Sequence, residues 1–224
     1  MEQLRTLMDT PEHPSHGVLS DRKSEFLGDA CHVASLSDAL RFVKATKNRH
    51  PKARHVAFAA LVGGYAQPVA ERMSDDGEPS GTAGKPILDT LRVTGLTDCV
   101  VCVTRYFGGI LLGSGGLIRA YAGCASRALE RAQMAELVEF QQYACDVAYS
   151  QLRSMNKLVE DHAGVQISAE YTDRVRLLME VPTAGSVSFE MRIREVFNAG
   201  VKPLRLARVQ RPVARRHVRD ADNG

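Results

Sequence analysis

The chain has 224 residues, of which 44% are hydrophobic and 25% charged, and its formal net charge is +3. This composition is typical of one large or two small globular domains. No apolar run approaches the roughly 20 residues of a membrane span, and the first residues lack the charged-then-apolar pattern of a signal peptide. We therefore expect a cytoplasmic protein that makes no membrane contact.

Five cysteines, an odd number, favour reduced thiols over a disulfide framework. Cys99 and Cys102 form a C-x-x-C pair within a predicted strand. Because side chains alternate along a strand, an offset of three places the two thiols on opposite faces. We interpret both as core residues.

The first half of the chain predicts a loose tail followed by an α/β domain. Residues 1–16 are polar, contain two prolines and predict a flexible tail, and the domain is expected over residues 17–135. Its predicted elements are strands over 17–19 and 26–31, a helix capped by Ser37 and closed by Pro51, a strand over 55–62, an outer strand over 66–73, and a short helix around 87–91 that Gly95 ends. The strand over 55–62 is apolar on both alternations, so we expect it to be covered on both faces.

Residues 74–86 form a long loop with three carboxylates in four residues, at Asp75, Asp76 and Glu78, followed by small residues that include Thr82. Hard cations take oxygen ligands, so a metal site is one interpretation. The spacing does not match a calcium loop, and no His or Cys is close in sequence. Carboxylates in proteins are usually exposed to solvent or paired with a cation, so a solvated turn, or an ion pair with Arg105 or Arg119, is favoured.

The rest of the chain is organised around residues 99–129. A β-branched strand ends near Arg105, glycines follow, and an apolar stripe then predicts a helix with Ser114 as its N-cap. Unpaired backbone N–H groups at such a place suit an anion. The candidate anion-binding residues are Arg105, Gly108, Gly109, Gly113, Ser114, Gly115, Gly116 and Arg119. The alternative is that the glycines serve only a tight turn and close packing, since neither the P-loop nor the dinucleotide pattern is met.

A second unit is predicted over residues 139–210. Alternating strand patterns and two helical patterns follow one another in the order β-α-β-β-α-β, the ferredoxin-like plan with both helices on one sheet face. The predicted fold class of the whole chain is therefore α+β.

Positive charge concentrates towards the end of the sequence. Residues 202–224 hold seven Lys and Arg against two Asp, a net charge of +5. We expect Arg174, Arg176 and Arg205 on the open face of the second sheet and a basic, disordered tail over 211–224. Such a concentration of charge is a footprint of nucleic-acid contact. The candidates are Arg174, Arg176, Arg205, Arg208, Arg211, Arg215 and Arg216. A solvated tail is the alternative, and no aromatic pair on the open face supports base stacking as in RNA-recognition motifs.

Three motifs resemble the IMPACT/YigZ family. They are Asp75–Gly84 (DDGEPSGTAG), Val103–Gly109 (VTRYFGG) and Leu112–Tyr121 (LGSGGLIRAY), and His55 also falls where that family has a histidine. The resemblance covers about residues 17–132, and the second unit matches the second domain of the bacterial members. It implies that His55, Asp75, Asp76, Glu78, Thr82, Tyr106 and Tyr121 share one surface.

The resemblance also implies folds and a role. The first domain would be similar to the second domain of a small-subunit ribosomal protein, and the second to the last domain of the translocating elongation factor. Eukaryotic relatives restrain an amino-acid-starvation kinase, with an extra N-terminal domain that this sequence lacks. For bacterial members the implied role is translation-linked regulation with nucleic-acid or ribosome binding.

Two hypotheses of function follow. The first is a non-enzymatic module that binds RNA, the ribosome or a translation-regulatory protein, without a cofactor or metal. The second is an enzyme that acts on a phosphorylated small molecule through the glycine-rich loop, because small-molecule kinases of a related fold carry a similar loop with serine where this chain has Gly115 and Gly116. No spacing pairs Ser80, Thr82 or Ser114 with His55 as an activated nucleophile. The sequence does not define an oligomeric state.

Overall fold

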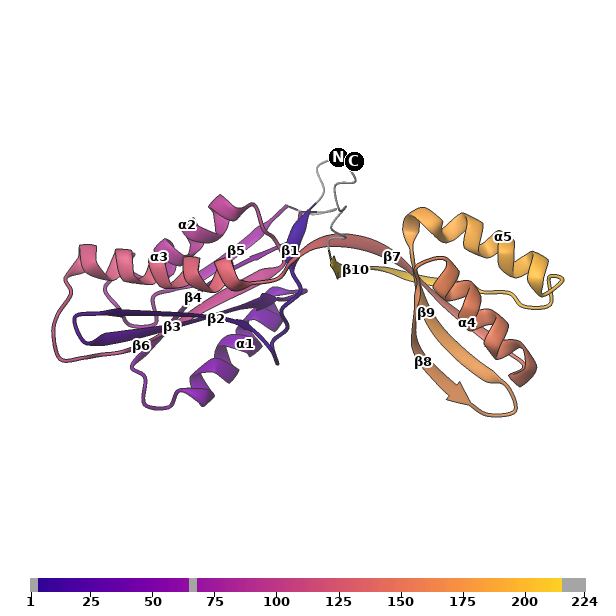
Figure 1. Cartoon of the computed structure of the whole chain (residues 1–224), viewed down its shortest axis with the longest axis horizontal. Coiled ribbons are helices and arrows are strands. Elements are labelled where there is room, and N and C mark those ends of the chain that lie inside the picture. Colours follow the sequence, from indigo (N-terminus) through magenta and orange to yellow (C-terminus); the bar gives the residue numbers. More distant parts are fainter. Residues whose placement is uncertain (1–3, 65–67, 215–224) are drawn as a thin grey trace, which may run out of the picture. The chain divides into compact units, whose positions relative to one another are not determined.

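The computed structural model describes residues 4–64 and 68–214, and it divides the chain into two compact units. Of the described residues, the first unit comprises 4–64, 68–137 and 212–214, and the second comprises Val138–Arg211. The change of unit between Leu137 and Val138 lies within the interval, 135–139, where the sequence predicts one. Each unit contains one sheet with helices packed on it (Figure 1).

A five-stranded antiparallel sheet is the centre of the first unit. Its strand order is β2 (Ser15–Asp21), β3 (Ser24–His32), β6 (Cys99–Tyr106), β4 (His55–Val62) and β5 (Ala70–Ser74). Strand β6 lies in the middle, with Val101 opposite Ala30 of β3 and opposite Ala59 of β4. The β-branched run that precedes Arg105 is therefore the most enclosed part of the sheet.

Helices cover both faces of this sheet. Helix α1 (Leu36–Arg49) lies on one face, and helices α2 (Gly84–Thr94) and α3 (Ser114–Arg131) lie on the other (Figure 1). Phe42 of α1 packs in the same core as Phe58 of β4, whereas Leu91 of α2 packs in the opposite core with Ala59 of β4. The prediction that residues 55–62 are covered on both faces is confirmed.

The two thiols of the C-x-x-C pair belong to different cores. Cys99 packs on the face covered by α2 and α3, and Cys102 packs on the face covered by α1. Both are free and fully buried. Burial raises the pKa of the Cys99 thiol to about 12. These cysteines behave as small apolar side chains, as the strand offset predicts.

The prediction of a loose tail over residues 1–16 is wrong for the described residues. Strand β1 (Arg5–Leu7) pairs antiparallel with Met134–Glu136, the start of strand β7 (Met134–Val147). The side chain of Leu7 is fully buried, and the Thr6 hydroxyl donates to the Asp98 carbonyl at 3.0 Å. These partners lie about 90 and 130 residues away in sequence, so no local pattern signals them.

Two predicted helix caps are also wrong. Ser35, not Ser37, caps α1, because its hydroxyl accepts from the Asp38 backbone N–H at 3.1 Å. Gly113 is the N-cap of α3, and Ser114 is the first helical residue with no capping hydrogen bond. By contrast Gly95 ends α2 in the left-handed conformation, with φ of +66°, as its sequence position predicts.

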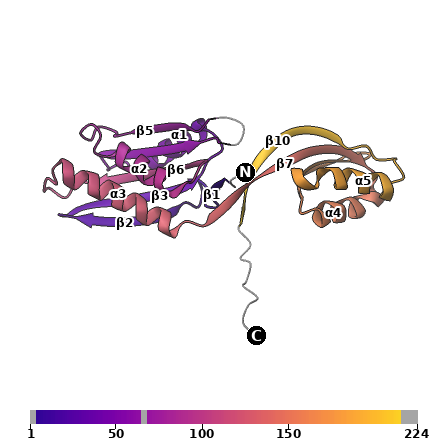
Figure 2. The same cartoon turned by 90° about the horizontal axis from the view of Figure 1, so that it is seen from above.

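The second unit has the predicted β-α-β-β-α-β order. After the part of β7 that it contains come the one-turn helix η1 (Tyr149–Gln151), α4 (Leu152–Asp161), β8 (Val165–Tyr171), β9 (Val175–Pro182), the one-turn helix η2 (Thr183–Gly185), α5 (Ser186–Val196) and β10 (Leu204–Ala214). The sheet order is β10-β7-β9-β8. Helices α4 and α5 cover one face (Figure 2), where Met155 and Phe189 pack with Tyr143 and Met179.

Strand β10 corrects the predicted disordered tail over 211–224. Residues 211–214 continue β10, and residues 215–224 lie outside the described part of the chain. Among the described residues no helix has the length and apolar character needed to cross a membrane.

Candidate anion-binding site

Three motifs from distant parts of the sequence meet at Glu78. The Arg105 guanidinium of β6 donates from Nη1 to Glu78 Oε1 at 2.7 Å, and the Tyr121 hydroxyl of α3 donates to the same oxygen at 2.8 Å. The side chains of Glu78 and Arg105 are 3% and 8% exposed. The expectation that Glu78 lies against Arg105 is therefore met, and this pair attaches the acidic loop to the sheet and to helix α3.

Aromatic rings enclose this ion pair. Tyr121 packs edge-on against Phe26, with ring centroids 5.2 Å apart, and the Arg105 guanidinium lies over the rings of Phe26 and Phe107. Burial, followed by the charge of Glu78, raises the pKa of the Tyr121 hydroxyl, so Tyr121 remains a donor. Glu78 and Tyr121 are thus occupied with each other and with Arg105.

Asp75 organises the loop at the start of α2. Its carboxylate accepts from the backbone N–H groups of Gly81 at 2.9 Å, Ala83 at 3.0 Å and Gly84 at 2.8 Å. Burial alone would raise the pKa of Asp75, but the three N–H donors outweigh it and hold the pKa below its ordinary value. Within the same loop, the hydroxyl of the buried residue Thr82 donates to the Pro79 carbonyl at 2.6 Å.

Asp76 joins the loop to strand β4 and fixes His55. Its carboxylate accepts from the Val56 backbone N–H at 2.7 Å and pairs with Lys47 of α1. Its carbonyl accepts from His55 Nδ1 at 2.8 Å, which leaves Nε2 as the available ring nitrogen of His55. Among the described residues no cluster of His, Cys, Asp or Glu is arranged to hold a metal ion. Tyr106 lies further along β6, where its hydroxyl bonds His50 Nδ1 at 2.9 Å.

The glycines after β6 separate into two kinds. A side chain at Gly108 would lie 1.9 Å from the Lys23 carbonyl oxygen, and one at Gly116 would lie 2.9 Å from Leu112 Cβ, so close packing accounts for both. Gly109 and Gly113 have positive φ angles of +86° and +73° with open space beside them. Gly115 is neither strained nor crowded, because the nearest atom to an added Cβ is Arg119 Nη1 at 3.5 Å.

The beginning of helix α3 carries backbone donors that no described residue caps. The first intrahelical bond runs from the Leu117 N–H to the Gly113 carbonyl at 3.0 Å, and no side chain caps the helix. The N–H groups of Ser114, Gly115 and Gly116 therefore have no intrahelical acceptor. Arg119, one turn on, is exposed and makes no hydrogen bond or ion pair with any described residue. The helix dipole and this cation both favour an anion here.

A small pocket opens beside the Glu78–Arg105 pair. It has a volume of about 180 Å³ and is lined by Arg54, His55, Arg105, Phe107 and Leu111. Arg54 is exposed and has no partner among the described residues. Sequence reasoning missed Arg54, Phe107 and Leu111 as site residues. The sequence offered one signal for these three residues: Arg54 is adjacent to His55, Phe107 is two residues after Arg105, and Leu111 lies between Gly109 and Gly113.

Most of the predicted nucleic-acid arginines are occupied by acceptors within the second unit. Arg176 pairs with Asp146 at 2.9 Å, Arg208 with Glu139 at 3.3 Å and Arg211 with Glu180 at 2.8 Å, and the Arg174 guanidinium donates to the Asp146 carbonyl at 3.1 Å. Arg205 pairs with Glu190 of helix α5 at 2.5 Å, so its placement on the open sheet face is wrong. Arg211 belongs to β10 rather than to a tail, and Arg215 and Arg216 lie outside the described residues.

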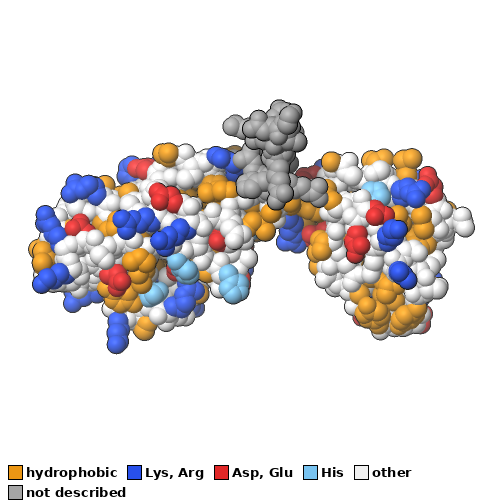
Figure 3. All heavy atoms as spheres, viewed as in Figure 1, with side chains coloured by type: hydrophobic (Ala, Val, Ile, Leu, Met, Phe, Trp, Pro, Cys, Tyr) orange, Lys and Arg blue, Asp and Glu red, His pale blue; other side chains and the backbone are white. Residues whose placement is uncertain are grey.

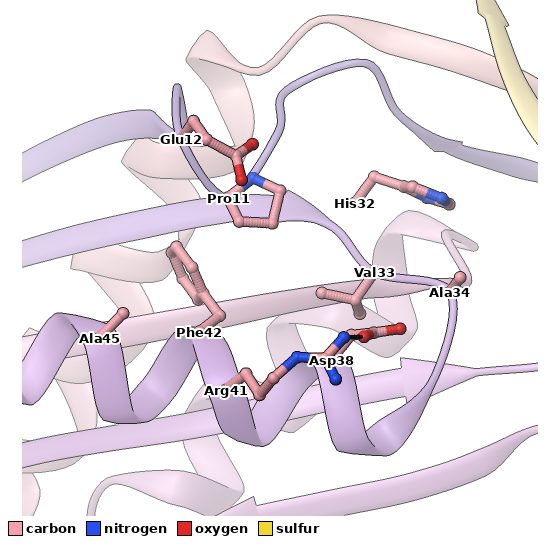
Figure 4. A pocket seen from close by; sticks show the side chains of 9 residues that line it. All are labelled: Pro11, Glu12, His32, Val33, Ala34, Asp38, Arg41, Phe42 and Ala45. Atoms are coloured by element: carbon pink, nitrogen blue, oxygen red, sulfur yellow. Dashed lines mark hydrogen bonds and ion pairs between the residues drawn. The ribbon is translucent and has the colours of Figure 1, made fainter. Parts of the chain in front are cut away.

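Charge alone does not single out a binding surface on the first unit. Lys and Arg side chains are scattered over its visible face rather than gathered in one stripe (Figure 3). A larger pocket of about 430 Å³ lies beside α1, where Glu12 and Pro11 face Phe42 (Figure 4). Its Arg41 and Asp38 pair with each other, so this pocket offers less uncompensated charge than the one beside Arg105.

Comparisons with known proteins agree with the arrangement of two sheets. The fold and the site define a two-unit α+β protein whose first unit places a glycine loop, an uncapped helix and arginines together. Residues 22–129 match the family model described as the Impact N-terminal domain. The chain belongs to the IMPACT family.

Bacterial relatives cover most of the chain. An IMPACT family member of Haemophilus influenzae is 36% identical over 174 residues, which is 78% of this chain and 84% of that protein. The IMPACT family member YigZ of Escherichia coli is 34% identical over 185 residues, 83% of this chain and 91% of that protein. A solved structure described as a hypothetical protein superposes with a TM-score of 0.65 and 31% identity over 92% of this chain and 98% of that chain.

Proposed function

We propose that this IMPACT-family protein is a non-enzymatic, translation-linked regulatory protein of the cytoplasm that binds RNA, free or within the ribosome. Its first unit would hold RNA phosphates at the site described above. The observation that carries the proposal is the set of three backbone N–H groups at the start of α3, at Ser114, Gly115 and Gly116, beside Arg119, which has no partner in the described part of the chain. Phosphate oxygens are well suited to such donors.

We place the site in the first unit because four arginines of the second unit already pair with carboxylates. A guanidinium that already bonds a carboxylate must lose or share that partner before it binds a phosphate, so its contribution to RNA affinity is reduced. This applies to Arg176, Arg205, Arg208 and Arg211. Arg119 and Arg54 carry no such cost.

We also propose the finer fold assignments that the resemblance implies. The β-α-β-β-α-β order of the second unit, with both helices on one face, supports the ferredoxin-like plan. The first unit would be similar to the second domain of a small-subunit ribosomal protein. Fold likeness alone does not establish function, so the RNA proposal depends on the site.

Binding of a labelled single-stranded RNA to the full chain, followed by fluorescence anisotropy over a salt series, tests the proposal. We expect affinity to fall steeply with salt, and Arg119→Gln to lower the logarithmic salt slope by about 0.7, the value for one phosphate contact in a single strand. The matched control is Arg153→Gln, which removes another exposed arginine, near the start of α4. Absence of salt-dependent binding, or equal effects of the two variants, would contradict the proposal.

The second candidate, an enzyme that acts on a phosphorylated small molecule, is favoured by one observation. The same uncapped helix follows a glycine loop directly, an arrangement that also holds phosphates of small ligands. It predicts turnover of a phosphorylated metabolite without RNA affinity, whereas the binding protein predicts RNA affinity without turnover.

A further inference from the structure

The pocket beside Arg105 has cationic and apolar walls that the proposed function does not yet use. Arg54, His55 and Arg105 supply nitrogen groups, and Phe107 and Leu111 supply apolar surface. Its volume of about 180 Å³ is below the roughly 300–1,000 Å³ of pockets that enclose a whole drug-sized ligand. One end group of a ligand would therefore enter it, rather than an entire nucleotide.

The charges around the pocket leave a positive excess. Glu78 is paired with Arg105, and Asp76 is paired with Lys47. These two carboxylates are therefore balanced, and Arg54 remains without a partner among the described residues.

Two side chains of the pocket, His55 and Arg105, are held in place before any ligand arrives. His55 is oriented by its Nδ1 bond to the Asp76 carbonyl at 2.8 Å. The Arg105 guanidinium is fixed between Phe26 and Phe107 and uses only Nη1 for a protein acceptor, while its buried Nε has no partner among the described residues. A guanidinium with donors left over, 8% exposed in a pocket wall, indicates a site for an acceptor-rich group.

We infer that this pocket binds a terminal phosphate monoester, and that its ligand in the proposed function is the phosphorylated end of an RNA strand. A monoester carries about one and a half to two negative charges near neutral pH and has one covalent link, so it suits a small, cationic pocket. An internal phosphodiester carries one negative charge, and the RNA strand continues from both of its ester oxygens, so a small pocket would have to be open on two sides to hold it. This inference rests on the proposed function for the RNA part of the ligand, but the phosphate chemistry is also that of a free phosphorylated small molecule.

Four probes separate the sources of the phosphate. They are one RNA 10-mer with hydroxyl groups at both ends, the same RNA with a 5′-phosphate, the same RNA with a 3′-phosphate, and adenosine monophosphate. Binding of the full chain to each is measured by isothermal titration calorimetry at one salt concentration. We expect at least one phosphorylated RNA to bind roughly ten- to a hundred-fold more tightly than the hydroxyl RNA. The terminal phosphate would add one charge-assisted hydrogen bond, and that difference in affinity corresponds to one such bond.

A matched pair of variants tests the pocket itself. Arg54→Gln, at an exposed side chain, should lower the affinity for the phosphorylated RNAs to that measured for the hydroxyl RNA. Lys52→Gln removes an exposed cation two residues away that does not line the pocket, and should leave the preference for a terminal phosphate intact.

Each outcome bears on the inference separately from the proposed function. Equal affinity for all three RNAs would overturn the inference and leave RNA binding in place. Binding of adenosine monophosphate that depends on Arg54, without RNA binding, would uphold the phosphate pocket and overturn the RNA proposal. Binding of neither RNA nor adenosine monophosphate would overturn both, and a preference that survives Arg54→Gln would place the terminal phosphate elsewhere.

Discussion

The arginines considered for RNA binding differ between the two units in the partners that they have. In the first unit, Arg54 and Arg119 are exposed and make no ion pair with any described residue. In the second, Arg176, Arg205, Arg208 and Arg211 are each bound to a carboxylate. The basic end of the sequence therefore carries less available charge than its composition suggests. A count of Lys and Arg identifies a binding surface only when the acceptors around each residue are known.

The largest expected effect is on the free energy of unfolding, and it compares the loss of a buried ion pair with the loss of an exposed one. Glu78→Gln leaves the Arg105 guanidinium, 8% exposed, without a counter-charge, and should lower the free energy of unfolding by about 3–5 kcal/mol. Glu139→Gln is the control, since it breaks the more exposed pair with Arg208 and should cost at most about 1 kcal/mol. Urea titration measures both, and similar costs would show that the Glu78 cluster does not hold the acidic loop.

Within the second unit, Arg211 should differ from its neighbour Arg208. Glu180 is 1% exposed, and the Arg211 hydrogen bonds hold its pKa below the ordinary value near 4.5 against the effect of burial, with help from Gln142. Arg211→Ala leaves this buried carboxylate without its cation and should cost about 1–3 kcal/mol of unfolding free energy at neutral pH. Arg208→Ala should cost less than about 1 kcal/mol.

The cost of Arg211→Ala should also depend on pH. A carboxyl with a lowered folded pKa stabilises the protein above its unfolded pKa, and this contribution is lost as the pH falls through the folded pKa. The difference in unfolding free energy between wild type and Arg211→Ala should therefore shrink as the pH falls below the ordinary glutamate pKa of 4.5. An Arg211→Ala cost that stays constant from pH 7 to pH 3 would contradict a role for Glu180 ionisation.

A smaller effect concerns RNA affinity. Replacing Arg208 by Gln should leave RNA binding and its salt slope unchanged, because the guanidinium is bound to Glu139, whereas Arg119→Gln should weaken binding several-fold. Anisotropy with the same RNA at two salt concentrations makes the comparison. If Arg208→Gln has the larger effect, the second unit rather than the glycine loop contacts the RNA.

Periodicity predicted much of the fold because local burial decides it. Residues 55–62 are apolar on both faces and are covered on both faces, and the alternating pattern after residue 139 gives the β-α-β-β-α-β order. Strand β1 was missed because a three-residue strand has no period to detect and its partner, β7, is about 130 residues away. The cap of α1 was misplaced by two residues, since Ser35 and Ser37 are both good N-caps.

The candidate site was only partly predictable. The motifs placed Glu78 against Arg105, because their shared resemblance to one family implied a common surface. The sequence did not show which carboxylates already have partners in the folded protein. Asp75 accepts from a backbone N–H group at the start of α2, and Asp76 pairs with Lys47. Nor did the sequence reveal that Arg54 lines the pocket without a partner among the described residues, because partners across strands are set by tertiary packing.

The smallest expected effect is on stability, and it tests whether Gly115 is required for packing or for binding a ligand. A Cβ at Gly115 would meet only Arg119 Nη1 at 3.5 Å, an ordinary contact, and Ala is favoured over Gly in a helix by about 0.5–1 kcal/mol. Gly115→Ala should therefore raise the free energy of unfolding by up to that amount. Its Cβ also tilts towards the helix N-terminus, over the free N–H groups, so RNA affinity should fall.

The matched variant is Gly116→Ala, whose Cβ would lie 2.9 Å from Leu112 Cβ. Because that contact is too close, Gly116→Ala should lower stability as well as RNA affinity, and the two effects cannot be separated. Gly115→Ala separates them: higher stability together with weaker RNA binding indicates that Gly115 keeps the helix N-terminus open for a phosphate. Urea titration and anisotropy on the same preparation measure the two quantities. Higher stability with unchanged RNA affinity would instead show that no phosphate approaches this turn of α3, and the proposed site would be wrong.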